Sequence, residues 1–157
     1  MKRVYILLMA MVVAFALAGC SGTDAEPEEA TPTDAGVLGS YEVAIGDCEI
    51  VKDYDGNDTI AISIDFTNNG EEATSFEGSM MYDVFQDGVE LETTSVYVDD
   101  DSLDCLDDDA YKDIKPGKTI EVVVTKKLEN TTSPVDIEIE ELFGSDDKVV
   151  KTFELEE

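Results

Sequence analysis

A cysteine at the end of a short apolar stretch is the first residue whose surroundings predict a specific chemistry. Cys20 ends the run Leu17-Ala18-Gly19-Cys20, after a basic N-terminus and the uncharged stretch 4–16. Small residues before the cysteine fit the groove of a signal peptidase, and the thiol is the nucleophile that accepts diacylglycerol. The pattern predicts a lipoprotein signal peptide over residues 1–19 and lipidation of Cys20. The alternative is an ordinary secretory signal that happens to end in cysteine.

Two further cysteines, Cys48 and Cys105, remain after lipidation. In an exported chain, an even number of cysteines favours pairing. We therefore predict a disulfide between Cys48 and Cys105, which would close a loop long enough to gain roughly 4 kcal/mol by restricting the unfolded chain. Two separate thiols are the alternative, and they would suit an anaerobic host.

The segment around Cys105 is rich in aspartate, and calcium prefers hard oxygen ligands of this kind. The candidate calcium ligands are Asp99, Asp101, Asp104, Asp107 and Asp109. Their spacing is not that of an EF-hand, and blocks of like charge are usually solvated. We therefore favour a solvated loop without a cofactor and keep calcium as the alternative. A second acidic group, formed by Asp53, Asp55 and Asn57, is better explained by a hairpin turn than by a calcium loop.

No residue pattern in the chain predicts catalysis. The sequence contains no histidine, which excludes His-dependent nucleophiles and the usual zinc sites. No glycine-rich loop matches a phosphate cradle. Paired carboxylates could hydrolyse glycosides, but with 38 acidic residues some carboxylate always lies near another. A non-enzymatic protein is therefore expected, with a carbohydrate-active enzyme as the weakest alternative.

The net charge of −28 limits the classes of partner. Cleavage before Cys20 removes Lys2 and Arg3 and no acidic residue, so the mature chain carries −30. Such a field repels nucleic acid and anionic lipid headgroups, and it attracts cations and basic partners. A solvated acidic surface in a crowded or salty habitat explains the same charge without any partner.

A flexible tether is expected between the lipidated cysteine and the folded domain. Residues 20–39 are expected to form a disordered acidic linker that carries the lipidated Cys20. The part from Ser21 to Gly36 has two prolines, five acidic residues and no aromatic or β-branched apolar residue. Such a composition cannot bury a core. A flexible chain of this length spans about 20 Å, enough to hold a domain clear of the headgroups.

From about Ser40 the composition changes to short apolar runs. In residues 59–68 apolar side chains recur at every second position, which predicts a strand with one buried face. Similar runs occupy 41–50, 80–86, 90–98, 120–124, 135–140 and 148–155. The phase of the run 41–50 shifts near Gly46-Asp47, which predicts a β-bulge.

Turn signals between these runs favour antiparallel hairpins. Asp55-Gly56 and Asp87-Gly88 predict type I′ turns, with positive φ at both central residues. Asn69-Gly70 predicts a similar turn, and Lys115-Pro116-Gly117 predicts a type II turn. Seven or eight short strands over residues 40–157 predict one all-β domain, an antiparallel sandwich.

Several short motifs follow one another in a specific order. They are KDYDGN (52–57), DFTNN (65–69), ATSF (73–76), FQDGVELE (85–92), DIKPG (113–117) and ELF (141–143). Together they resemble an uncharacterised lipoprotein domain of Gram-positive bacteria, domain of unknown function family 5067. The resemblance implies an immunoglobulin-like β-sandwich and assigns no activity. The chain has no Trp and lacks the cysteine pair that joins the sheets of antibody domains, so it is not a true immunoglobulin domain.

Taken together, these features predict a lipid-anchored extracellular module on the outer face of the membrane. It would bind a protein, a peptide or a cell-wall glycan through a sheet face, an edge strand or the loop 99–109. A calcium-dependent structural or adhesive surface domain is the alternative. Tyrosines could form a sugar-stacking patch if they gathered on one face. The candidates are Tyr54, Tyr82, Tyr97 and Tyr111.

Overall fold

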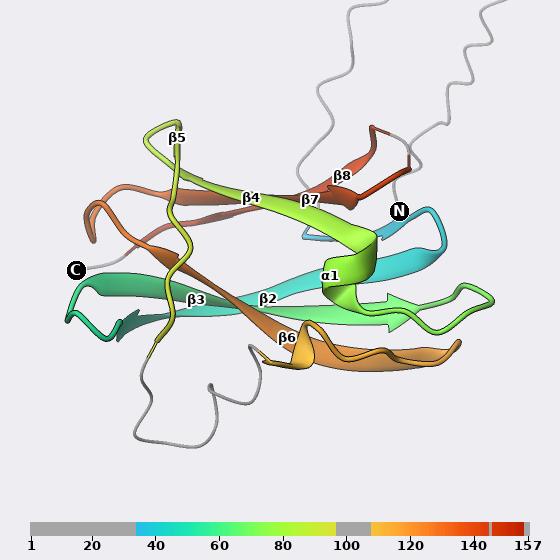
Figure 1. The fold of residues 1–157 in the computed structure, drawn as a ribbon. Helices are drawn as coiled ribbons and strands as arrows, with labels where there is room; N and C mark the ends of the chain where they lie inside the picture. The colour runs from blue at the N-terminus through green and yellow to red at the C-terminus, as the bar shows by residue number, and fades with distance from the viewer. Residues whose placement is uncertain (1–33, 97–107, 145, 156–157) are drawn as a thin grey trace, which may run out of the picture. The chain divides into compact units, whose positions relative to one another are not determined.

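The strands form two antiparallel sheets that face each other (Figure 1). The computed structural model describes residues 34–96, 108–144 and 146–155. The strand order is β1-β2-β3-β6 in the first sheet and β5-β4-β7-β8 in the second. The elements are β1 (Ala35–Leu38), β2 (Tyr41–Lys52), β3 (Asp58–Asn68), α1 (Phe76–Ser79), β4 (Met80–Gln86), β5 (Val89–Glu90), β6 (Lys118–Lys127), β7 (Val135–Glu141) and β8 (Lys148–Phe153). The predicted immunoglobulin-like β-sandwich of seven to eight strands is confirmed.

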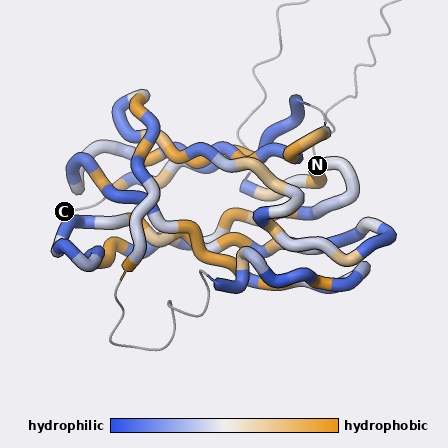
Figure 2. The backbone as a smooth tube through the Cα atoms, in the orientation of Figure 1, coloured by the Kyte–Doolittle hydropathy of each residue, from blue (hydrophilic) through white to orange (hydrophobic). Residues whose placement is uncertain are grey.

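The alternating patterns place one row of side chains from each sheet in the core. Ile60, Ile62 and Ile64 of β3 are fully buried, and so are Ile137 and Ile139 of β7. Figure 2 shows hydrophobic residues along the strands and hydrophilic residues in many of the turns. Burying a side chain of this size contributes about 1.5–3 kcal/mol. Within the described ranges, no helix is long and apolar enough to cross a membrane.

The predicted bulge in β2 is confirmed, because the register of β2 against β3 shifts between Ile45 and Cys48. Lys151 of β8 reaches across the sandwich to this bulge. Its Nζ donates to the backbone oxygens of Ile45 at 3.1 Å and of Gly46 at 2.7 Å. A lysine that points inward from an edge strand also disfavours pairing of that edge with another chain.

The turn predictions are confirmed in part. Asp87 and Gly88 have φ values of 53° and 76°, as a type I′ turn requires. Gly117 has a φ of 74°, as predicted for the type II turn. The type I′ prediction for Asp55-Gly56 was wrong, since Asp87 is the only non-glycine residue with positive φ in the described part of the chain.

Asp53 explains the different turn between β2 and β3. Its Oδ1 accepts hydrogen bonds from the backbone nitrogens of Asp55 at 3.0 Å and Asn57 at 2.8 Å. Its Oδ2 accepts a bond of 2.8 Å from the Asn57 side chain. This carboxylate closes the loop without positive φ at Asp55. The interpretation of these residues as a hairpin turn is therefore confirmed.

Two segments differ from the sequence expectation. β1 lies inside the range 20–39 that was assigned to the disordered tether, because its backbone pairs with β2 and its Leu38 side chain is buried. The folded part thus begins earlier than residue 40. The strand expected over 90–98 was also wrong in length, because only Val89–Glu90 pairs with β4. The following residues cross to the first sheet, where Thr125 Oγ1 donates to the Thr94 carbonyl at 2.6 Å.

Candidate functional site

A buried asparagine at the end of β3 sets the shape of the loop that follows. The Asn68 side chain is fully buried. Its Nδ2 donates to the backbone oxygens of Glu72 at 2.8 Å and Ile114 at 3.0 Å, and its Oδ1 accepts from the Gly70 nitrogen at 2.9 Å. Gly70 has no positive φ, so the hairpin-like turn predicted for Asn69-Gly70 was wrong. Asn68 holds the loop instead, and the loop is fixed before any ligand arrives.

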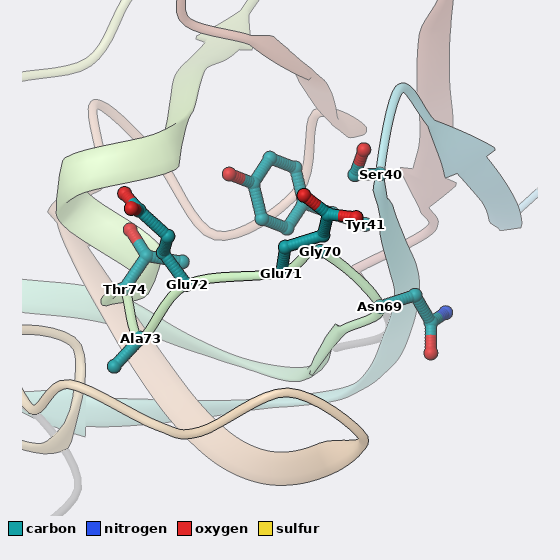
Figure 3. A pocket seen from close by; sticks show the side chains of 8 residues that line it. All are labelled: Ser40, Tyr41, Asn69, Gly70, Glu71, Glu72, Ala73 and Thr74. Carbon is teal, nitrogen blue, oxygen red and sulfur yellow. The ribbon is translucent and has the colours of Figure 1, made fainter.

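The fixed loop and the β1–β2 turn enclose an open hollow of about 560 Å³ (Figure 3). The Asn69 nitrogen donates to the Ser40 carbonyl at 3.0 Å, which fastens the two sides together. The hollow is lined by Ser40, Tyr41, Asn69, Gly70, Glu71, Glu72, Ala73 and Thr74. A volume of this size lies in the range of roughly 300–1,000 Å³ that small-ligand sites occupy.

The lining combines one aromatic ring with acidic side chains. The Tyr41 ring is half-buried and packs on Phe66, with 5.5 Å between the ring centroids. In Figure 3, the Glu71 carboxylate is drawn across the edge of this ring, and the Glu72 side chain lies to its left. Both carboxylates are exposed, and neither takes part in an ion pair of the described residues. The arrangement can accept hydrogen bonds and can attract a cation to the face of the ring.

A second hollow of about 560 Å³ lies at the other end of β3. It is lined by Gly56, Asn57, Asp58, Lys127, Leu128, Glu129, Asn130, Thr131 and Thr132. Several of its polar groups already bond to other groups of the protein. Asn130 Oδ1, for example, accepts from the nitrogens of Thr132 at 3.0 Å and Ser133 at 2.7 Å. No aromatic ring lines it, so the hollow beside Tyr41 is the stronger candidate site.

The predicted calcium ligands are placed only in part. Asp99, Asp101, Asp104 and Asp107 lie outside the described residues. Asp109 is half-buried and forms an ion pair with Lys112. Among residues 34–96, 108–144 and 146–155, no three acidic or cysteine side chains gather as a metal site. Calcium at the acidic loop therefore stays an untested alternative to the solvated loop.

The cysteine predictions also rest on residues beyond the described ranges. Cys48 is half-buried in β2 and packs against the core. Burial raises the pKa of its thiol, and the nearby Lys151 ammonium opposes that shift. Cys20 and Cys105 lie outside the described residues, so lipidation and the Cys48–Cys105 disulfide stay predictions.

Among the described residues, the three tyrosines of the hypothetical sugar-stacking patch do not gather on one face. Tyr54 is exposed in the turn between β2 and β3. Tyr111 is exposed near the opposite end of β3. Its neighbour Ala110 lies there against α1, because the Ala110 carbonyl accepts a hydrogen bond from the Glu77 nitrogen. Tyr82 is half-buried beside Phe76, with 5.7 Å between the ring centroids, and Tyr97 lies outside the described residues.

Sequence reasoning missed the hollow and its ring. Tyr41 was assigned only to a strand, and Asn69-Gly70 only to a turn. Glu71 and Glu72 were two of many acidic residues. The available signal was the pair Asn68-Asn69, because an asparagine that ends an apolar strand can hold the following loop with its side chain.

Comparison with known proteins places this sandwich in a group without assigned activity. A candidate lipoprotein from Staphylococcus aureus subsp. aureus NCTC 8325 shares 18% identity, with a TM-score of 0.60 over 78% of this chain and 88% of that chain. A protein from Enterococcus faecalis shares 20% identity, with a TM-score of 0.57 over 80% and 92%. An uncharacterised β-sandwich protein from Clostridium difficile 630 shares 14% identity, with a TM-score of 0.54 over 82% and 100%.

These likenesses show a shared β-sandwich fold. No curated protein matches the chain in sequence. The family model described as "Domain of unknown function (DUF5067)" matches residues 21–141, which is most of the chain and includes Tyr41, Glu71 and Glu72. The chain therefore belongs to the DUF5067 family.

Proposed function

We propose that this protein is a non-enzymatic binding module, anchored by lipid on Cys20 at the outer face of the cell membrane. The anchor is supported by the Leu17-Ala18-Gly19-Cys20 motif after a short apolar stretch. The similarity to a candidate lipoprotein of the same fold is consistent with this location. The acidic segment after Cys20 would act as the spacer between the lipid and the sandwich.

The single observation that carries the binding proposal is the hollow beside Tyr41. Asn68 and the Asn69–Ser40 backbone bond hold its walls in place. A site that is already ordered loses little conformational freedom when a ligand binds. The ligand would be a protein, a peptide or a cell-wall component, because the charge of −28 disfavours nucleic acid.

The non-enzymatic character is supported by the residues available for chemistry. The chain has no histidine, and the side chains that line the hollow include no lysine or cysteine. The hydroxyl of Thr74 shares a hydrogen bond of 2.7 Å with Ser79 rather than with a base. Hydrolysis of a cell-wall glycan by the pure protein would contradict this part of the proposal.

Cross-linking on living cells tests the proposal directly. Cells would express the anchored chain or a Cys20→Ala variant that cannot be lipidated, and captured partners would be identified by mass spectrometry. We expect one dominant partner for the anchored chain and its loss in the variant. Capture of no reproducible partner, or the same partner from both, would contradict an anchored binding module.

A further inference from the structure

We propose that the hollow beside Tyr41 binds a primary ammonium group on an aliphatic stem, such as a lysine side chain of a basic peptide. This inference rests on the proposed binding function and names the chemistry of the ligand. The hollow supplies the face of one aromatic ring, two carboxylates and several hydroxyl or amide groups. Ammonium groups are attracted to aromatic faces through the ring quadrupole, and to carboxylates through charge.

The sandwich already uses this chemistry with a lysine of its own. The buried Lys126 of β6 places its Nζ 5.3 Å from the centroid of the Tyr82 ring. The Tyr82 hydroxyl donates to the Glu77 carboxylate at 3.2 Å. Tyr82 thus joins the Lys126 ammonium to the Glu77 carboxylate, and the Lys126 Nζ also donates to Thr93 Oγ1 at 3.0 Å. The hollow repeats two parts of that arrangement, the ring of Tyr41 and the carboxylates of Glu71 and Glu72.

The third part, the ammonium, is missing from the hollow. No lysine lines it, and the cation–ring contacts within the described ranges join Lys126 to Tyr82 and Lys151 to Phe153. Glu71 and Glu72 are exposed, and no described ion pair neutralises them. A ligand that carries an ammonium group would complete the arrangement, and one that carries an anion would face two carboxylates.

The hollow is large enough for one side chain of a peptide ligand. Its volume of about 560 Å³ admits a lysine side chain and the backbone next to it. The loop cannot easily widen, because Asn68 bonds it at both Gly70 and Glu72. An aliphatic stem can lie along the ring while its charged end reaches the carboxylates.

A titration with a minimal lysine probe tests this inference. The probe is acetyl-Gly-Lys-Gly-amide, and its matched control carries Nε-acetyl-lysine, which has the same stem without the charge. The lipidated full chain is held in neutral detergent micelles and observed by NMR. We expect the lysine probe to shift the Tyr41 ring and residues 69–74 in a saturable way. The acetylated probe should cause no saturable shift there.

Two pairs of variants locate the site. Glu71→Gln with Glu72→Gln should weaken binding about fivefold to tenfold, because two exposed carboxylate contacts are lost. Glu49→Gln with Glu129→Gln removes the same charge from exposed residues at the other end of β3 and should change affinity less than about twofold. Spectra of both variants without probe check that the fold is kept.

Equal weakening by both pairs, or equal binding of the two probes, would overturn the ammonium site. In that case the general acidic field, or an uncharged feature of the probe, explains the binding. The proposed binding function would still stand if cross-linking on cells captured a partner that the Glu71→Gln, Glu72→Gln chain retains. If cross-linking captured no partner but the lysine probe still bound in a saturable way, the ammonium site would be supported. The proposal of an anchored binding partner would then be contradicted.

Discussion

Three buried polar side chains organise the loops of this protein. Asp53 closes the turn between β2 and β3, Asn68 holds the loop after β3, and Gln86 holds the loop between β6 and β7. Each satisfies several backbone groups that would otherwise be buried without a partner. Buried amides of this kind give each loop one conformation, which a hydrophobic side chain at the same position could not do.

Replacing Gln86 by Ala should lower the free energy of unfolding by about 3 kcal/mol. Its Oε1 accepts from the nitrogens of Glu129 and Asn130, and its Nε2 donates to the carbonyls of Asn130 and Ser133. Truncation leaves these groups unpaired beside a cavity. Chemical denaturation measures the loss. The exposed Glu129→Ala variant keeps its backbone nitrogen and should lose less than about 0.5 kcal/mol. Similar losses for both variants would contradict this role of Gln86.

The carboxylate of Asp53 should contribute to acid sensitivity. The hydrogen bond from the Asn57 side chain is the largest of the effects that hold its pKa below the usual value. Its contribution to stability is therefore complete above the unfolded pKa of about 3.9, and it is lost as the pH falls through the lower folded pKa. An Asp53→Asn variant should lose stability less steeply than the wild type below about pH 4. Urea midpoints measured at several pH values check this, and an unchanged slope would refute it.

The two cysteines that remain after lipidation should form one disulfide. The intact mass of the Cys20→Ala chain, which retains only Cys48 and Cys105, should rise by the mass of two hydrogens when the unfolded protein is reduced, because one bond is opened. A Cys48→Ser variant of this chain should show no such rise. If the mass of the Cys20→Ala chain is also unchanged by reductant, Cys48 and Cys105 are separate thiols.

At the scale of elements, two edge strands each carry a lysine that points inward between the sheets. Lys151 points inward from edge strand β8 to the bulge of β2, and Lys126 points inward from edge strand β6 to Tyr82. Another chain that paired with β8 would meet Lys151, whereas the edge of β6 at Lys126 is already covered by Glu92 and Thr93. Of the other two edge strands, β5 is only two residues long and β1 has four residues. The lysines therefore join the sheets to each other, and Lys151 also limits aggregation through the edge of β8.

A Lys151→Met variant should lose about 2 kcal/mol of stability, because two hydrogen bonds from a charged group to buried carbonyls disappear. Met retains an apolar stem of similar length, so the loss of stability measures the contribution of the lysine ammonium group. Lys118→Met, at an exposed position of β6, is the matched control and should cost less than about 0.5 kcal/mol. Thermal or denaturant unfolding measures the stability of both variants. Equal losses would contradict the role of Lys151 in stabilising the bulge of β2.

At the scale of the whole molecule, acidic residues face one another across the strands. Asp65 of β3 is paired with Glu121 of β6, and Asp83 of β4 is paired with Glu138 of β7. Like charges in such positions destabilise a sheet. With a net charge of −28, general repulsion adds to these local pairs.

Sodium chloride should therefore raise the melting temperature by several degrees between about 0.01 and 0.5 M, as screening weakens the repulsion. Calcium at equal ionic strength should add little, if the acidic loop is solvated as we expect. A further rise with calcium that disappears in an Asp99→Asn, Asp101→Asn, Asp104→Asn variant would instead establish the calcium site. Differential scanning calorimetry of both proteins separates these outcomes.

Local chemistry in the sequence determined the class of this protein. Alternating residues such as Ile60, Ile62 and Ile64 specify a strand with one buried face, and Asp87-Gly88 specifies the turn between β4 and β5, because both signals act over a few residues. The bulge near Gly46-Asp47 could be predicted for the same reason. The all-β sandwich followed from these local signals and from the family motifs.

Only the tertiary structure decided the rest, because contacts between distant residues control it. β1 is a strand because β2 offers it a partner, although its own composition resembles a tether. The pair Asn68-Asn69 could indicate a loop held by a side chain, but Asn68 also reaches the carbonyl of Ile114, 46 residues away, and no local pattern predicts that partner. The hollow beside Tyr41 exists because that loop and the β1–β2 turn meet at one end of the first sheet. Its ring and its carboxylates come together through folding and are separated in the sequence.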